Sequence, residues 1–198
     1  MHEVPRIRTP ISESLAASSL VGALAANGEH PHQREAQLLL AQIWLETGRG
    51  SSCNNFNVGN ITASDRYDGG AFRPAWFTVS AASSSQMKHL HELMLKGQAP
   101  RAFRAYATLE AGMGDYVHQL NTTFQSIVAA ARTGDALATA TAIKTSRYTP
   151  DIEPASVAKT LDSIAKEFAA RGTFAALPLA GASQPPPAAP AAPLCPPA

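Results

Sequence analysis

The segment from Gln33 to Glu46 constrains the fold more than any other part of this 198-residue sequence. Apolar side chains occupy most positions between Ala36 and Leu45, so the pattern predicts a helix that is apolar on nearly every face. Glycines at positions 48 and 50 follow as helix-stop signals. A helix of this kind belongs at the centre of a domain, and the sequence therefore predicts a buried central helix over Gln33–Glu46.

Further helices are predicted on both sides of the central one. An N-terminal helix over Ser12–Ala26 either packs on the core or serves only as a lead-in. The C-terminal helical patterns cover Ala81–Lys96, Thr108–Leu120, Phe124–Arg132, Asp135–Thr145 and Pro154–Arg171. Between Asn54 and about Val79 the pattern is short, aromatic and rich in turn residues, which predicts a small β-hairpin or an irregular lobe.

The chain divides into three regions on this basis. Residues 1–31 are a lead-in with a short helix, and residues 32–175 form one mainly helical domain. Residues 176–198 are dominated by proline and alanine and have almost nothing to bury, so we expect a disordered tail. This tail is a candidate tether to a larger assembly.

Composition and charge exclude several classes of function. The net charge of +1 gives no electrostatic case for nucleic-acid binding. No apolar run reaches the roughly 20 residues of a membrane span, and prolines and acids interrupt the N-terminus where a secretory signal would lie.

His89 and His91 point in different directions on a helix, so we expect no metal site. Cys53 and Cys195 are expected to be free thiols rather than a bridge.

Glu46 stands at the C-terminal end of the apolar helix. Apolar surroundings and the negative end of the helix dipole both raise the pKa of a carboxyl there, as a general acid requires. Position alone favours the alternative, a glutamate that faces solvent or caps a nearby arginine such as Arg49. The following loop shifts this balance, because its uncharged amides suit sugar hydroxyl and N-acetyl groups, although asparagine also favours left-handed turns. These amides belong to Asn54, Asn55, Asn57 and Asn60.

Three segments carry a resemblance to a known family. The stretch QIWLETGRGSSCNNFNVGNI resembles the active-site segment of bacterial and phage N-acetylglucosaminidases of the lysozyme superfamily, glycoside hydrolase family 73. FRAYATLEAGMGDYVHQL and AIKTSRYTPDIEPASVAKTLDSIAKEF resemble two later segments of that family, in the same order. The resemblance implies a mainly α, lysozyme-like domain with a small extended lobe that forms one wall of a cleft.

The same resemblance implies a function. The protein would be a peptidoglycan hydrolase that cuts glycan strands at an N-acetylhexosamine linkage. It would act on the bacterial cell wall, either as a phage protein or as an exported wall hydrolase. No metal or organic cofactor is implied. Glu46 matches the general acid and Tyr148 an active-site tyrosine. The loop that shapes the floor of the glycan groove is matched by Asn55, Phe56, Asn57 and Gly59. Positions expected to be structural are matched by Tyr106, Asp115 and Tyr116.

The second carboxylate that glycosidases usually need is the least defined part of the pattern. The predicted lobe offers Asp68, followed by two glycines, and Asp65; turn initiation explains Asp68 equally well. Trp76 is a candidate for stacking on a sugar, whereas Phe72 and Phe77 are expected to attach the lobe to the body. Two alternatives stay open: a lytic transglycosylase or muramidase that acts on the same polymer, and a glycan-binding module without turnover.

Overall fold

A computed structural model describes residues 2–64, 67–72 and 102–181 of the chain. These residues form six helices and a three-stranded sheet. The helices are α1 (Glu13–Ala26), α2 (Gln33–Glu46), α4 (Leu109–Thr122), α5 (Gln125–Arg132), α6 (Ala136–Thr145) and α7 (Pro154–Arg171). The strands are β1 (His2–Glu3), β2 (Gly70–Phe72) and β3 (Phe103–Arg104). The predicted mainly helical architecture is confirmed, and the helix predicted over Ala81–Lys96 lies outside the described residues.

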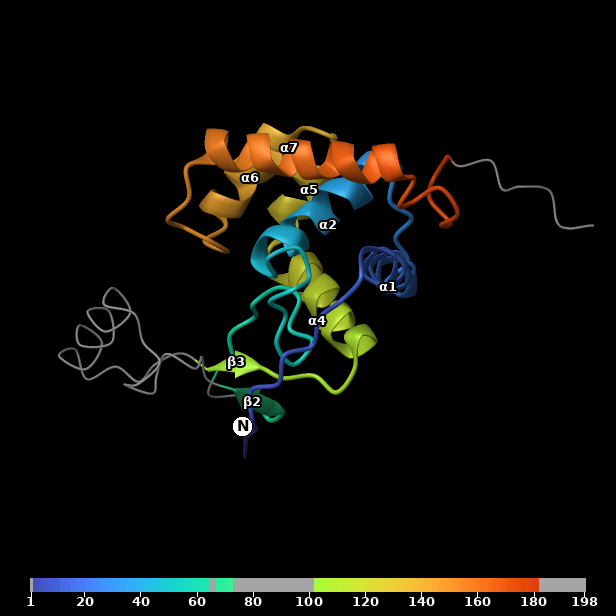
Figure 1. Ribbon diagram of the computed structural model, residues 1–198. Coiled ribbons are helices and arrows are strands. Elements are labelled where there is room, and N and C mark those ends of the chain that lie inside the picture. Colours follow the sequence, from blue (N-terminus) through green and yellow to red (C-terminus); the bar gives the residue numbers. More distant parts are fainter. Residues whose placement is uncertain (1, 65–66, 73–101, 182–198) are drawn as a thin grey trace, which may run out of the picture.

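Helix α2 is the central helix of the body. It packs against α1, α5 and α7, and α7 lies across it in Figure 1. Every residue from Glu35 to Trp44 is buried, which explains the apolar side chains on all faces. Trp44, expected in the core, is 4% exposed and meets Phe168 of α7 edge-on, with 5.8 Å between ring centroids. The prediction of a buried central helix is therefore confirmed.

Side-chain caps explain why the helices begin where the sequence predicted. Ser12, Thr108 and Asp135 each accept a hydrogen bond from a backbone N–H in the first turn of the helix that follows. Such a cap satisfies a donor that has no partner within the helix. Pro154 begins α7, at a position where its missing N–H removes no helical hydrogen bond.

The small sheet has the strand order β1-β2-β3, with β1 parallel to β2 and β2 antiparallel to β3. It lies at the end of the molecule away from α7 (Figure 1). Within the described residues, β2 finds its partners outside the predicted lobe instead of forming a local hairpin. Phe72, expected to attach the lobe to the body, is buried and stacks on Phe103 of β3 with 5.9 Å between centroids, so the contact seen lies within the sheet.

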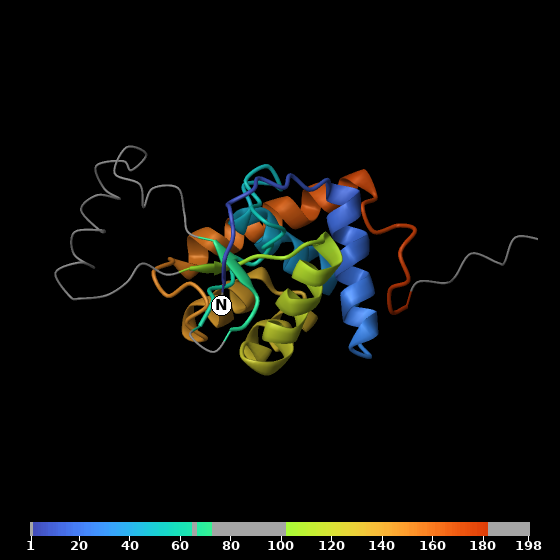
Figure 2. The same ribbon diagram turned by 90° about the horizontal axis from the view of Figure 1, so that it is seen from below.

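The N-terminal segment belongs to the same body. Beyond β1, it runs along the loop that follows α2: Thr9 N donates to Cys53 O, and Asn55 N donates to Ile7 O (Figure 2). Leu20 of α1 is fully buried in the core shared with α2. Of the two possibilities left open for the N-terminal helix, the structure shows packing on the core.

The chain also stays packed on the body after α7. Phe174 and Leu179 are buried, and Ala180 N donates to Pro31 O at 3.0 Å. Ordered packing thus continues beyond residue 176, where the tail was expected to begin. Residues 182–198, including Cys195, lie outside the described residues, and Cys53 is a buried free thiol. In the described ranges, no helix is both long and apolar enough to cross a membrane.

Candidate active site

Glu46 is the last residue of α2, and the chain turns sharply after it. Arg49 and Gly50 have positive φ angles of 58° and 79°. Thr47 Oγ1 donates to Ile43 O at 2.7 Å and accepts a hydrogen bond from Gly50 N at 3.0 Å. This hydrogen-bonded turn fixes the end of the helix and, with it, the backbone from which the Glu46 side chain projects.

Two side chains donate hydrogen bonds to the Glu46 carboxylate. Asn60 Nδ2 lies 2.8 Å from Oε2, and Thr149 Oγ1 lies 3.4 Å from Oε1. Burial raises the pKa of the Glu46 carboxyl, while both hydrogen bonds stabilise the charged form and oppose that rise. The net direction is upward, so Glu46 keeps its proton to a higher pH than an exposed glutamate does. This is the property that a general acid needs.

Arg49 is paired with another residue. Its guanidinium donates two hydrogen bonds to the carboxylate of Glu167 on α7, at 2.7 Å and 3.0 Å. Glu46 therefore does not cap Arg49, and it is half-buried rather than solvent-facing, with its carboxylate bonded to Asn60 and Thr149.

Two tyrosines lie against Gly59, on the loop that follows α2. Tyr148 OH donates to Gly59 O at 2.5 Å, and Tyr116 OH donates to Gln42 Oε1 at 3.1 Å. A methyl group at Gly59 would lie 2.6 Å from the Tyr116 ring and 2.7 Å from the Tyr148 hydroxyl, so this close approach requires glycine. Burial, above all, raises the pKa of both hydroxyls, and the charge of Glu46 adds to it. Both tyrosines therefore stay protonated.

Asn55 and Asn57 hold the same loop from within the protein. They are 7% and 1% exposed. Their amides are hydrogen-bonded at 2.8–3.0 Å to backbone atoms of Pro5, Ile7, Ile61 and Arg104. Asn55 and the half-buried Phe56 also adopt left-handed φ angles of 49° and 51°. The turn chemistry considered for the asparagines applies here, and these amides shape the loop instead of standing free.

Asp115 of α4 joins the helical body to the sheet. It accepts hydrogen bonds from Arg104 Nη1 of β3 at 2.8 Å and 2.9 Å, and a further one from the Tyr106 hydroxyl. The Arg104 guanidinium also lies over the ring of Tyr67, 4.7 Å from its centroid. These contacts give Tyr106 and Asp115 a structural role, as the resemblance implied.

The candidates for a second carboxylate make no hydrogen bond to Glu46 or lie outside the described residues. Asp68 precedes β2, is exposed, and makes no hydrogen bond or ion pair with another described residue. Asp65, Trp76 and Phe77 fall outside the described ranges. Among the described residues, no group of three or more His, Cys, Asp or Glu side chains is arranged to hold a metal ion.

Sequence reasoning missed two residues of the site, Gln42 and Thr149. Gln42 stands four residues before Glu46, and this spacing places both on one helix face, so a usable signal existed. Thr149 adjoins Tyr148, but its bond to Glu46 spans 103 positions of sequence, and no local pattern predicts it. Asn60 was considered only as one of several amides in the loop.

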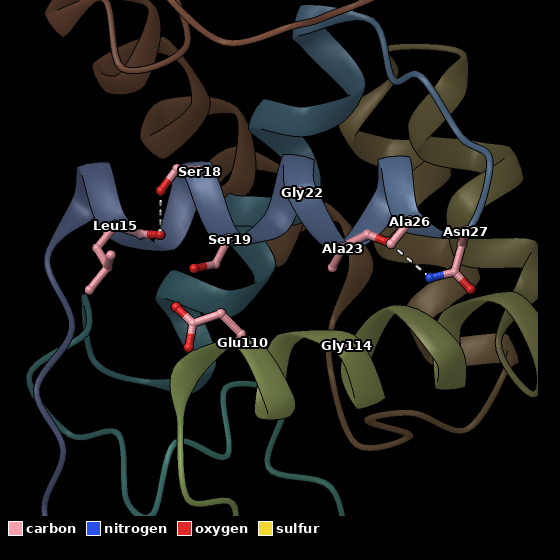
Figure 3. A pocket seen from close by; sticks show the side chains of 9 residues that line it. All are labelled: Leu15, Ser18, Ser19, Gly22, Ala23, Ala26, Asn27, Glu110 and Gly114. Carbon is pink, nitrogen blue, oxygen red and sulfur yellow. Dashed lines mark hydrogen bonds between the residues drawn. The ribbon is translucent and has the colours of Figure 1, made fainter.

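A separate groove of about 500 Å³ lies between α1 and α4 (Figure 3). Small side chains dominate its lining, which comprises Leu15, Ser18, Ser19, Gly22, Ala23, Ala26, Asn27, Glu110 and Gly114. None of the predicted site residues lines this groove, so it is distinct from the surroundings of Glu46.

Neither a family model nor a curated protein sequence matches this chain. Solved structures do. A peptidoglycan hydrolase from Sphingomonas sp. A1 is similar with a TM-score of 0.52 and 22% identity, over 83% of this chain and 90% of that one. The glycoside hydrolase domain of FlgJ from Salmonella typhimurium has a TM-score of 0.51 and 21% identity, over 82% and 91%.

This chain has the fold of these hydrolase domains. The similarity extends over most of its length, and it confirms the lysozyme-like architecture that the sequence resemblance implied: helices around a central one, with a small β lobe. At this level of identity the structures establish the fold. Which residues carry out a reaction has to be argued from the site itself.

Proposed function

We propose that this protein is a peptidoglycan hydrolase that cuts glycan strands at an N-acetylhexosamine linkage, with Glu46 as the general acid. The observation that carries the proposal is the Glu46 carboxyl, partly buried at the end of α2 and bonded to Asn60 and Thr149, with a pKa raised by burial. The solved structures with the same fold are described as a peptidoglycan hydrolase and a glycoside hydrolase domain, which supports this substrate class.

In the proposed reaction, Glu46 donates its proton to the glycosidic oxygen. The bond between that oxygen and the anomeric carbon breaks, and its electron pair stays on the oxygen. Water then adds to the anomeric carbon and gives its proton to a carboxylate, either the second acid or the deprotonated Glu46, which leaves a reducing end. Glu46 becomes a carboxylate beside the Asn60 amide, which is already in place to donate to it, and the Thr149 hydroxyl, which can also donate, so its new charge is stabilised.

Tyr148 and an aspartate are proposed to stabilise the positive charge that develops on the sugar. The proton of the Tyr148 hydroxyl is donated to Gly59 O, so its oxygen lone pairs are what remains for the substrate. Two aspartates are candidates for the second carboxylate: Asp68, which is among the described residues, and Asp65, which is not. The substrate's own N-acetyl group is a third source of stabilisation. Asp68 acts in this role only if its turn moves toward Glu46.

Lytic transglycosylase chemistry is the second candidate. One observation favours it: within the described ranges, no second carboxylate is bonded to or paired with the site around Glu46. In that reaction a single glutamate acts as acid and then as base, and a hydroxyl of the sugar attacks to give a 1,6-anhydro end. Either reaction takes place on the bacterial cell wall, where residues 182–198 are a candidate tether.

Mass spectrometry of the fragments released from purified peptidoglycan tests the proposal. The wild type and Glu46→Gln are compared, with Glu110→Gln as the control because that glutamate is exposed on α4. We expect Glu46→Gln to lose about 10²–10⁴-fold in rate, the usual contribution of general acid catalysis, and the control to keep its activity.

The ends of the fragments distinguish the alternatives. Reducing-end N-acetylglucosamine supports the glucosaminidase, and reducing-end N-acetylmuramic acid moves the cut to the neighbouring bond. Anhydro ends establish the transglycosylase. If the wild type releases no fragments, the proposal fails on this substrate, and a binding module becomes the better account.

A further inference from the structure

Asn60 binds Glu46 through two hydrogen bonds from one amide nitrogen. Its Nδ2 lies 3.0 Å from the Glu46 backbone oxygen and 2.8 Å from carboxylate Oε2. A backbone carbonyl oxygen only accepts hydrogen bonds, so the amide atom facing it is the NH₂ group and not the amide oxygen. Both N–H bonds of Asn60 are therefore directed at Glu46, one at the end of the helix and one at the carboxylate.

The backbone around Asn60 holds this amide in place. Asn60 has a φ of 48°, in the left-handed region that asparagine tolerates better than most residues. On one side, the Gly59 carbonyl accepts the Tyr148 hydroxyl at 2.5 Å. On the other side, Ile61 N donates to Asn57 Oδ1 at 2.8 Å. Since both neighbours are anchored, the Asn60 side chain is preorganised against Glu46.

The two oxygens of Glu46 consequently have different partners. Oε2 faces an N–H group, which can donate but cannot accept, and in a carboxylic acid the unprotonated oxygen is the better acceptor for such a donor. Oε1 faces the Thr149 hydroxyl at 3.4 Å, which can donate to a carboxylate or accept from a carboxylic acid. The proton of the acid form is therefore placed on Oε1, and Oε2 remains the acceptor in both states.

We propose that Asn60 is a positioning residue for Glu46: its amide holds Oε2 and so makes Oε1 the oxygen that gives up the proton. The inference rests on the proposed function of Glu46 as a general acid. When the O–H bond at Oε1 breaks, the proton goes to the glycosidic oxygen and the electron pair stays on Glu46. The amide is then already in contact with the carboxylate that forms.

Substitution of Asn60 by glycine gives the sharpest test. Asn60→Gly keeps the left-handed backbone and removes the amide, while Asn60→Asp keeps the shape and replaces the donor with an acceptor. Thr149→Val removes the partner of Oε1. Thr62→Ala is the control, because Thr62 is exposed on the same loop and its side chain makes no hydrogen bond to another described residue.

The first readout is the titration of the Glu46 side-chain carboxyl carbon, followed by NMR in the full-length chain, and it does not depend on activity. We expect its midpoint to move to higher pH in Asn60→Gly and further in Asn60→Asp, and to stay unchanged in Thr62→Ala. Among the described residues, the other titratable groups coupled to Glu46 are Tyr116 and Tyr148, which stay protonated over this range. An unchanged midpoint in both folded Asn60 variants would overturn the proposal.

The second readout is the pair of kinetic constants of hydrolysis, kcat and KM. We expect Asn60→Gly to lower kcat by up to about 10²-fold with little change in KM, because the proton donor is misplaced while substrate binding is kept. If the wild type is active and Asn60→Gly has the same kcat, the proposal is also overturned. A wild type that releases no fragments instead refutes the proposed function, and the NMR titration still decides whether Asn60 acts on Glu46.

Discussion

At the scale of single residues, the site consists of one carboxyl group whose surroundings do not favour its charge. Glu46 is partly buried at the end of the central helix, and the described residues offer it amide and hydroxyl partners without a cation. The cation nearest in sequence, Arg49, is paired with Glu167. An ion pair would hold Glu46 ionised, whereas neutral donors leave it able to hold and to release a proton.

The stability of the protein should carry the signature of this carboxyl. Because burial raises the pKa of Glu46 above the ordinary value of 4.5, the folded state binds its proton more tightly than the unfolded chain does. That contribution to stability is fully present below the pKa of the unfolded chain and is lost as pH rises through the pKa of the folded state.

We therefore expect Glu46→Gln to gain in free energy of unfolding relative to the wild type as pH rises across this window. The gain amounts to about 1.4 kcal/mol for each unit by which the folded pKa is raised, and it levels off above the folded pKa. Denaturant unfolding at a series of pH values measures it. A difference between the two proteins that does not vary with pH would contradict the expectation.

At the scale of elements, α4 shows how a helix is fitted to the loop that carries the site. It contains two glycines, and their surroundings differ. A Cβ at Gly112 would lie 2.0 Å from the carbonyl oxygen of Phe56, whereas a Cβ at Gly114 would meet nothing within 4 Å. Gly112 thus lets α4 approach the loop after α2, while Gly114 faces the groove between α1 and α4 (Figure 3).

Replacing each glycine by alanine separates helix propensity from packing, because both substitutions have the same propensity gain. We expect Gly114→Ala to raise the free energy of unfolding by up to about 1 kcal/mol. Gly112→Ala should lower it by about 1–3 kcal/mol, because the methyl group forces α4 and the loop apart. Thermal or denaturant unfolding of the two variants checks this, and equal effects would show that the contact with Phe56 is not tight.

At the scale of the whole molecule, the N-terminal segment and the helical domain form one body. Strand β1 pairs with β2, residues 7–9 follow the loop after α2, and α1 shares the core. Glu13 at the start of α1 also pairs with Arg171 at the end of α7, but exposed ion pairs of this kind contribute little. The buried apolar contacts of α1 are what make the N-terminal segment part of the fold.

Two leucines of α1 test this unity. Leu20 is fully buried, and Leu15 on the same helix is 48% exposed. Leu20→Ala should lower the free energy of unfolding of the entire protein by about 2–5 kcal/mol, and Leu15→Ala should change it by no more than about 0.5 kcal/mol. Both should keep a single transition when unfolding is followed by far-ultraviolet circular dichroism and by tryptophan fluorescence. A separate, earlier unfolding transition in Leu20→Ala would show that α1 unfolds independently of the rest of the protein.

The helices and the principal acid were predictable from the sequence, because periodicity, capping residues and helix-stop glycines are local signals. The bounds of α2 and α7 agree with the prediction, and Ser12, Thr108 and Asp135 cap helices that were expected to start there. Glu46 stood out because it ends a helix whose positions from Ala36 to Leu45 are mostly apolar.

Only the tertiary structure decided what surrounds that acid. Asn60 and Thr149 reach Glu46 across 14 and 103 positions of sequence. Strand β2 pairs with β1, far before it in the sequence, and with β3, far after it. Such contacts depend on how the elements pack, and local sequence patterns do not specify that packing. The sequence by itself determined which segments are helical and which carboxyl ends the central helix. The packing of α2 against the loop and the Tyr148 turn decided which atoms hold that carboxyl, since hydrogen bonds between distant segments form only once the core brings them together.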